Sequence, residues 1–130
     1  MSTLQTNKIQ HLTSGFNNVV QFVDGAGTQN GTLCRAWVNF NGTSTVAIRG
    51  SFNVSSITDN GSGDYTVNFS NALSDGNYAI SAQSSDTPTY NYVSNVNNGS
   101  LTSSSVQVVS FRTSDRSLVD ATVFCVSIFR

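Results

Sequence analysis

Charged side chains are scarce in this sequence. Among its 130 residues, seven are acidic, all of them Asp because Glu is absent, and six are Lys or Arg, so the net charge is about −1 at neutral pH. A chain with so few cations lacks the basic surface with which proteins bind nucleic acid, and it lacks electrostatic attraction to an anionic membrane. We therefore expect neither nucleic acid nor a membrane among its partners.

Long apolar segments are also missing. No run of apolar residues approaches the length that spans a bilayer. Residues 1–10 are polar and do not show the basic and then apolar pattern of a secretory signal. We therefore expect the protein to be made and assembled in a cytoplasm.

Residues of common catalytic sites are few. The one histidine, His11, lies in an atypical N-terminal segment, and there is no G-x-S-x-G nucleophile motif. Glycoside hydrolysis would have to rely on Asp alone. Asp59 and Asp64 are the first and last residues of an oxygen-rich segment. This segment lacks the spacing and the bidentate Glu of an EF-hand, so a hairpin loop is favoured over a cation site. We expect no enzymatic activity and no cofactor.

The sequence contains two cysteines and one proline. Cys34 and Cys125 each lie within a strand pattern among apolar neighbours, which favours buried reduced thiols. A disulfide between the first and last core strands is the alternative, and a metal site would need further soft ligands.

The residues that are abundant favour strands. Ser, Thr, Asn and Gly supply most of the polar surface and have poor helix propensity, while Val, Ile, Phe and Tyr supply much of the apolar part. Apolar residues alternate with polar ones in four runs, which predict half-buried antiparallel strands: Cys34, Ala36, Val38, Phe40; Val46, Ile48; Phe52, Val54; Tyr65, Val67, Phe69. Asn41-Gly42 predicts a tight hairpin, and residues 58–63 predict a loop that is longer than two residues. Further strands are expected at 77–83, 106–111 and 121–129, and one within Tyr90–Val96. The fold class is therefore an all-β antiparallel sandwich, jelly-roll or lectin-like.

Residues 1–33 differ from the sandwich pattern that covers residues 34–130. Phe16 and Phe22 are apolar, but the segment is too short to bury its apolar surface alone, and the glycine-rich residues 24–31 indicate a turn-rich connector. We expect an extended arm that winds against the same segment of other subunits; a simple N-terminal strand is the alternative.

The last expected strand is apolar on both faces, with Phe124, Val126 and Ile128 on one side and Val123, Cys125 and Phe129 on the other. A strand in a two-sheet sandwich normally exposes one face to water. Trp37 also lies on the second face of its strand, opposite to the face that carries Val38 and Phe40, so it too needs a cover. We expect the interface of a closed homo-oligomer to include Trp37, Phe124, Val126, Ile128, Phe16 and Phe22. The alternative is a central strand that the N-terminal segment covers.

The motifs AWVNFNGT, IRGSFNVSSITDNGSGDYTVNF and LSDGNYAI resemble a block found in tail-fibre and other virion fibre proteins of bacteriophages, notably those of cyanobacteria and marine bacteria. The opening LQTNKIQHLTSG is similar to the segment that often precedes that block, so the resemblance covers about the first two thirds of the chain. It implies a homotrimer, located in the virion, with other virion proteins as partners of the N-terminal arm. The alternation from YTVNFSN to VFCVSIF is also similar to H-type lectin domains.

The segment from residue 86 to residue 98 is the best candidate for ligand binding. Tyrosines interleaved with Asn, Thr and Asp suit sugar rings and adaptable protein contacts, and an ordinary long loop is the alternative. The candidate residues are Asp86, Thr89, Tyr90, Asn91, Tyr92 and Asn95. Together with the resemblance, they favour a trimeric fibre or spike that takes part in adsorption to a host surface, through polysaccharide. A capsid or tail decoration protein is the alternative, and a polysaccharide-degrading spike is less favoured.

Overall fold

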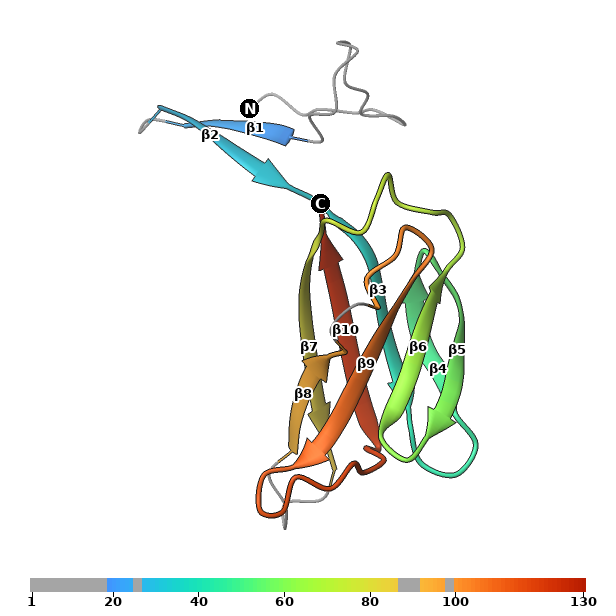
Figure 1. The fold of residues 1–130 in the computed structure, drawn as a ribbon. Coiled ribbons are helices and arrows are strands. Elements are labelled where there is room, and N and C mark those ends of the chain that lie inside the picture. The colour runs from blue at the N-terminus through green and yellow to red at the C-terminus, as the bar shows by residue number, and fades with distance from the viewer. Residues whose placement is uncertain (1–18, 25–26, 87–91, 98–99) are drawn as a thin grey trace. The chain divides into compact units, whose positions relative to one another are not determined.

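The structure is a computed structural model that describes residues 19–24, 27–86, 92–97 and 100–130. The chain divides into two compact units, Met1–Leu33 and Cys34–Arg130. In the described parts, every regular element is a β-strand (Figure 1). The strands are β1 Val19–Asp24, β2 Gly27–Thr32, β3 Cys34–Asn41, β4 Ala47–Phe52, β5 Val54–Gly61, β6 Asp64–Phe69, β7 Ala79–Ser85, β8 Tyr92–Val96, β9 Ser105–Arg112 and β10 Val123–Phe129.

The first unit contains the antiparallel pair of β1 and β2, whose register runs from Val19 opposite Thr32 to Asp24 opposite Gly27. The prediction of a turn-rich connector at residues 24–31 was therefore wrong over most of that range. Backbone groups can form a ladder whatever the side chains, so a Gly- and Asn-rich composition does not exclude a strand. Phe22 lies in β1 opposite Gln29, and Phe16 lies outside the described residues.

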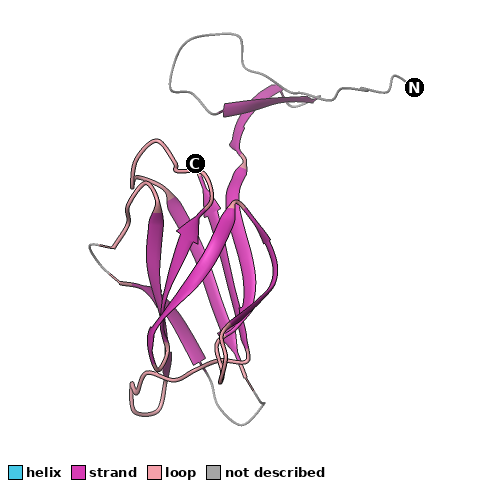
Figure 2. Ribbon diagram, turned by 90° about the vertical axis from the view of Figure 1, so that its right-hand side faces the viewer, coloured by secondary structure: helices cyan, strands magenta, loops and turns pink. Residues whose placement is uncertain are grey.

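The second unit confirms the predicted all-β antiparallel sandwich. One four-stranded sheet has the order β4-β3-β10-β7, and the other has the order β5-β6-β9-β8 (Figures 1 and 2). Side chains that alternate along each strand meet between the sheets and form one core, as the pattern of β6, with every second residue buried, illustrates. The core residues are Ala36, Val38, Phe40, Val54, Tyr65, Val67, Phe69, Leu73, Val106, Val108, Phe124, Val126 and Ile128.

The core determines which face of β10 is covered. Phe124, Val126 and Ile128 are at most 1% exposed, because they point between the two sheets. Their predicted role in an oligomer interface was therefore wrong: the sandwich itself buries them. Val123 and Phe129, on the other face, remain 36% and 38% exposed. The sequence showed two apolar faces, but only the pairing of the strands shows which of them the core uses.

The connection from β3 to β5 also differs from expectation. β3 ends at Asn41 and β4 begins at Ala47, so a longer loop replaces the predicted two-residue hairpin at Asn41-Gly42. The left-handed residue of this loop is Ser44, with φ 57°. Phe52 and Val54 do not share a face. Asn53, with φ 55°, ends β4 between them, so Val54 enters the core and Phe52 stays exposed.

The segment predicted as a long loop at 58–63 is mostly strand. β5 continues to Gly61 and reverses through Ser62 and Gly63 into β6, although the pairing is irregular between Asp59 and Gly61. β5 is an edge strand of its sheet. An edge strand can be polar along most of its length, because one side of it faces water, and this polarity resembles that of a loop.

Candidate functional site

The outer face of the β4-β3-β10-β7 sheet carries large apolar side chains near one end. Trp37 of β3 is paired with Phe52 of β4, and the two side chains are 42% and 56% exposed. Phe129 of β10 lies opposite Cys34, at the same end of β3. We call Trp37, Phe52 and Phe129 the outer aromatic patch. The interface role predicted for Trp37 is thus compatible with its position, whereas the partners predicted for it from β10 are in the core.

The two cysteines also belong to this sheet. Cys34 lies opposite Phe129, and Cys125 lies opposite Asn39, so the two thiols are several residues apart along the strands. Both are free and partly exposed. The thiols are thus unpaired, as predicted, and the alternative of a disulfide is not supported by the structure. Their predicted burial was wrong, because both are only partly buried.

The predicted binding residues are only partly brought together. Tyr92, the first residue of β8, donates a hydrogen bond from Oη to Oδ2 of Asp86 over 3.1 Å. Asn95 is exposed, while the alternating burial of β8 places Tyr92 on the other face of the strand. Thr89, Tyr90 and Asn91 lie outside the described residues.

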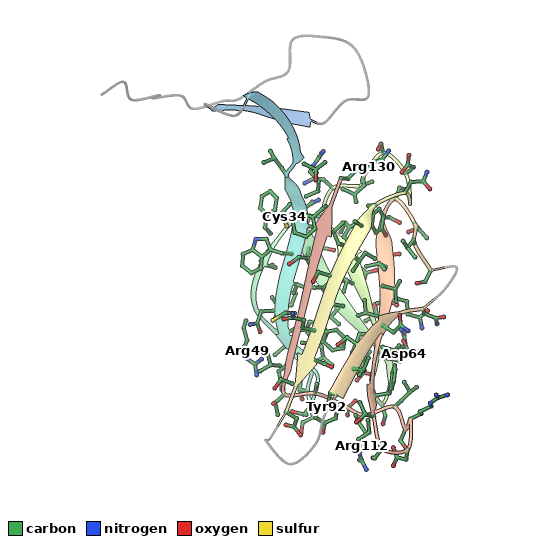
Figure 3. The ribbon with its side chains drawn as sticks, turned by 90° about the vertical axis from the view of Figure 1, so that its left-hand side faces the viewer. Cys34, Arg49, Asp64, Tyr92, Arg112 and Arg130 are labelled. Carbon is green, nitrogen blue, oxygen red and sulfur yellow. The ribbon has the colours of Figure 1, made fainter. Side chains whose placement is uncertain are left out.

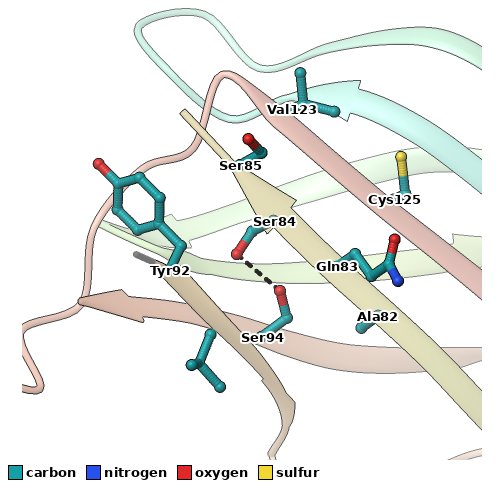
Figure 4. A pocket seen from close by; sticks show the side chains of 9 residues that line it. Ala82, Gln83, Ser84, Ser85, Tyr92, Ser94, Val123 and Cys125 are labelled. Atoms are coloured by element: carbon teal, nitrogen blue, oxygen red, sulfur yellow. Dashed lines mark hydrogen bonds between the residues drawn. The ribbon is translucent and has the colours of Figure 1, made fainter. Parts of the chain in front are cut away.

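A pocket of about 450 Å³ lies beside Tyr92, between the neighbouring parts of β7, β8 and β10 (Figure 4). Sequence reasoning identified Tyr92 but missed the residues from β7 and β10, because only the antiparallel register brings Val123 next to Ser85 and Cys125 next to Gln83. The residues that line the pocket are Ala82, Gln83, Ser84, Ser85, Tyr92, Val93, Ser94, Val123 and Cys125.

Three serine hydroxyls connect the two sheets behind this pocket. Ser94 of β8 donates to Ser84 Oγ over 2.8 Å, and Ser110 of β9 donates to the same oxygen over 2.9 Å. Ser110 is fully buried. A buried hydroxyl without a partner would be costly, so this network allows the sandwich to be polar here without a penalty.

The pocket lies at the end of the sandwich opposite to the point where the chain enters it. Cys34, the first residue of β3, lies at one end of the sandwich, and Tyr92 lies toward the other (Figure 3). The strand register supports this placement. Cys34 pairs with Phe129, the last residue of β10, whereas the pocket includes Val123, the first residue of β10. The pocket and Phe129 of the outer aromatic patch therefore lie toward opposite ends of β10.

The candidate cation ligands are engaged by protein groups. Asp59 accepts a hydrogen bond from the Gly61 N–H over 2.9 Å. Both carboxylate oxygens of Asp64 accept from Nε2 of Gln107, over 2.7 and 2.9 Å. In the part of the chain that the structure describes, no group of three or more His, Cys, Asp or Glu residues could hold a metal ion. These carboxylates thus have a turn-forming and a cross-strand role.

One buried polar cluster joins three connections of the sandwich. Tyr65 Oη lies 2.8 Å from Oδ1 of Asp120 and 3.0 Å from the carbonyl oxygen of Gly42, and Asp120 Oδ1 also accepts from the Gly63 N–H over 2.7 Å. Burial raises the pKa of the Tyr65 phenol, and its hydrogen bond to Asp120 and the negative charge of Asp120 raise it further. The phenol therefore remains a neutral donor. Because every group in this cluster is used in holding the loops together, we assign it a structural role.

No helix among the described residues is long and apolar enough to cross a membrane. In the comparisons with known proteins, no family model, no curated protein and no solved structure matches the chain.

Proposed function

We propose that this chain is a structural subunit of a bacteriophage virion, a homotrimeric fibre or spike that takes part in adsorption to the host surface. The viral assignment is supported by the resemblance of AWVNFNGT and the two following motifs to virion fibre proteins. The trimer, the N-terminal arm and the lectin-like character of the sandwich belong to the same proposal. No covalent reaction is part of it.

The observation that carries the proposal is the outer aromatic patch. Trp37, Phe52 and Phe129 are all more than a third exposed on one sheet of a small sandwich. Burying a large apolar side chain contributes about 1.5–3 kcal/mol relative to leaving it in water. A second copy of the chain offers matching apolar surface without further components, and closed symmetry is the usual result for identical subunits. The patch therefore supports an assembly of several copies.

The position of the pocket supports a role in adsorption. It lies at the end of the sandwich away from Cys34. Subunits that are held to a particle through the residues before Cys34 would turn the pocket outward. Several copies in one assembly would then bind repeated surface groups together, which raises avidity far above the affinity of one site.

Two experiments on the phage test this function. Labelled antibody fragments against the sandwich, viewed on intact particles by electron microscopy, should mark fibres or spikes, and soluble protein should reduce adsorption of the phage to its host. Labelling of the capsid or tail wall without any effect on adsorption would favour a decoration protein instead. Absence of the protein from purified particles would overturn the viral assignment.

A further inference from the structure

The pocket beside Tyr92 has a lining that suits a neutral ligand rich in hydroxyl groups. Four of its nine lining side chains carry a hydroxyl, one carries an amide, and none is charged. A charged ligand would find no opposite charge in this lining, and the carboxylate of Asp86 beside Tyr92 disfavours an anion. A volume of about 450 Å³ lies within the range of small-molecule sites, roughly 300–1,000 Å³.

Strand edges add further polar groups to this lining. β7 and β8 follow each other in sequence but are edge strands of different sheets. In the described structure β7 pairs with β10 and β8 pairs with β9, so the facing edges of β7 and β8 take no part in a common ladder. Consecutive residues of both strands, 82–85 and 92–94, line the pocket. Peptide N–H and C=O groups along such edges donate and accept hydrogen bonds, as the hydroxyls of a sugar require.

Tyr92 supplies the apolar surface that sugar recognition needs. Its hydroxyl is held by Asp86, which fixes one end of the side chain. The ring lines the pocket (Figure 4). An aromatic ring offers a flat apolar face to the C–H groups of a pyranose. Gln83, on β7 across the pocket, offers an amide that can both donate and accept. Ser84 is held in place by Ser94 and Ser110, so its orientation is determined before a ligand binds.

We infer that this pocket binds a neutral pyranose unit of a polysaccharide, with the sugar ring against Tyr92 and its hydroxyls bonded to Gln83, Ser85 and the edge of β7. The inference names the ligand class of the proposed adsorption function and rests on that function for its biological setting. The chemistry of the pocket is independent of where the protein resides.

The test measures sugar binding to the purified full-length chain in its native assembly. Saturation-transfer NMR and titration calorimetry with glucose, galactose, mannose and N-acetylglucosamine should show binding of at least one of them at millimolar concentration, and weaker binding of glucuronic acid. Tyr92→Ala should weaken that binding about tenfold, because the stacking surface is lost. Tyr92→Phe, which keeps the ring, should retain most of it, and Gln83→Ala should weaken it several-fold.

Matched control variants lie outside the pocket. Ser81→Ala changes the same exposed side of β7, and Ile48→Ala removes an exposed large side chain from β4; both should bind sugar as the wild type does. If Tyr92→Ala does not fold, the amide shifts of wild-type protein should still change with sugar mainly in β7 and β8. No binding of any of these sugars, binding that neither Tyr92→Ala nor Gln83→Ala weakens, or capture of an extended neutral peptide in place of sugar would overturn the inference.

The two proposals fail separately. Sugar binding by a protein that is absent from phage particles would reject the virion function and keep the pocket assignment. A protein that is found on fibres but binds none of the sugars would keep the virion function and reject the pocket assignment.

Discussion

The Tyr65 side chain joins two connections of the sandwich through its hydroxyl. Its hydroxyl reaches Asp120 and Gly42, and the ring packs in the core against Phe40 and Phe124. We expect Tyr65→Phe to keep the ring packing but to lower the free energy of unfolding by about 1.5–3 kcal/mol, because a buried hydrogen bond to a charged group is lost. Urea unfolding followed by circular dichroism measures this.

Tyr78→Phe is the matched control. The Tyr78 hydroxyl lies 3.0 Å from the carbonyl oxygens of Thr102 and Ser105, in a less buried position. Its loss should cost about 1 kcal/mol or less. Equal losses of unfolding free energy in the two variants would mean that the Tyr65–Asp120 hydrogen bond stabilises the fold no more than a less buried one does.

The raised pKa of Tyr65 also predicts how stability depends on pH. Above about pH 10 the phenol ionises in the unfolded chain, while burial and Asp120 keep its pKa higher in the folded protein. The unfolded state then binds fewer protons than the folded state, so the stabilisation is complete below about pH 10 and is lost as pH rises further. Burial raises the pKa of Tyr78 in the same direction. The free energy of unfolding should therefore fall as pH rises above about 10, and less steeply in Tyr65→Phe.

Single residues also show where prediction from sequence ends. Tyr92 was identified because an aromatic side chain among Asn, Thr and Asp has a recognisable composition. Gln83 and Ser85 were not, because they belong to an ordinary alternating strand and reach Tyr92 only through the fold. No local signal in the sequence marks them as pocket residues.

Among the elements, the β5–β6 hairpin depends on one backbone conformation. Gly63 has φ 66°, and a Cβ there would lie 2.4 Å from the Ser110 carbonyl oxygen and 2.5 Å from the Val119 nitrogen. We expect Gly63→Ala to cost about 2–5 kcal/mol, from backbone strain together with overpacking. Urea unfolding measures the loss.

Gly61→Ala separates the two causes. Gly61 has φ 129°, but a Cβ there would meet nothing within 4 Å. Its substitution should cost only the backbone strain, about 1–3 kcal/mol. A Gly61 variant as unstable as the Gly63 variant would show that the close approach to Ser110 and Val119 has no energetic effect.

Strands with one buried face were easier to predict from the sequence than exposed strands. β3, β6 and β10 were predicted because each has one face in the core, which imposes strict alternation on the sequence. The end of β5 and most of β2 were predicted as loop or connector, because an edge position or a two-stranded pair imposes no such pattern. The partner of each strand and the covered face of β10 depend on contacts between distant residues, which periodicity does not contain.

At the scale of the whole molecule, the outer aromatic patch predicts the state of assembly. We expect the wild type to have the mass of several chains by light scattering, and Trp37→Ser with Phe52→Ser to shift it toward one chain. The reason is that the exposed aromatic surface that two copies would share is removed. An unchanged circular dichroism spectrum should accompany this shift.

Leu118→Ser and Ile48→Ser serve as controls, since both residues are exposed and apolar but lie outside the patch. They should leave the mass unchanged. A wild type that is already a single chain at micromolar concentration would remove the support that the patch gives to a multi-copy fibre.

The place of β10 in its sheet has a consequence for the order of events during synthesis. β10 is the last of the described strands in sequence, yet it lies between β3 and β7 and joins them. Until β10 has emerged from the ribosome, β3 and β7 therefore have no common neighbour, and the core lacks Phe124, Val126 and Ile128. Such long-range pairing folds slowly. A nascent chain should remain accessible to protease and chaperone until Phe129 has left the exit tunnel, so copies of the sandwich would associate only after β10 has been added.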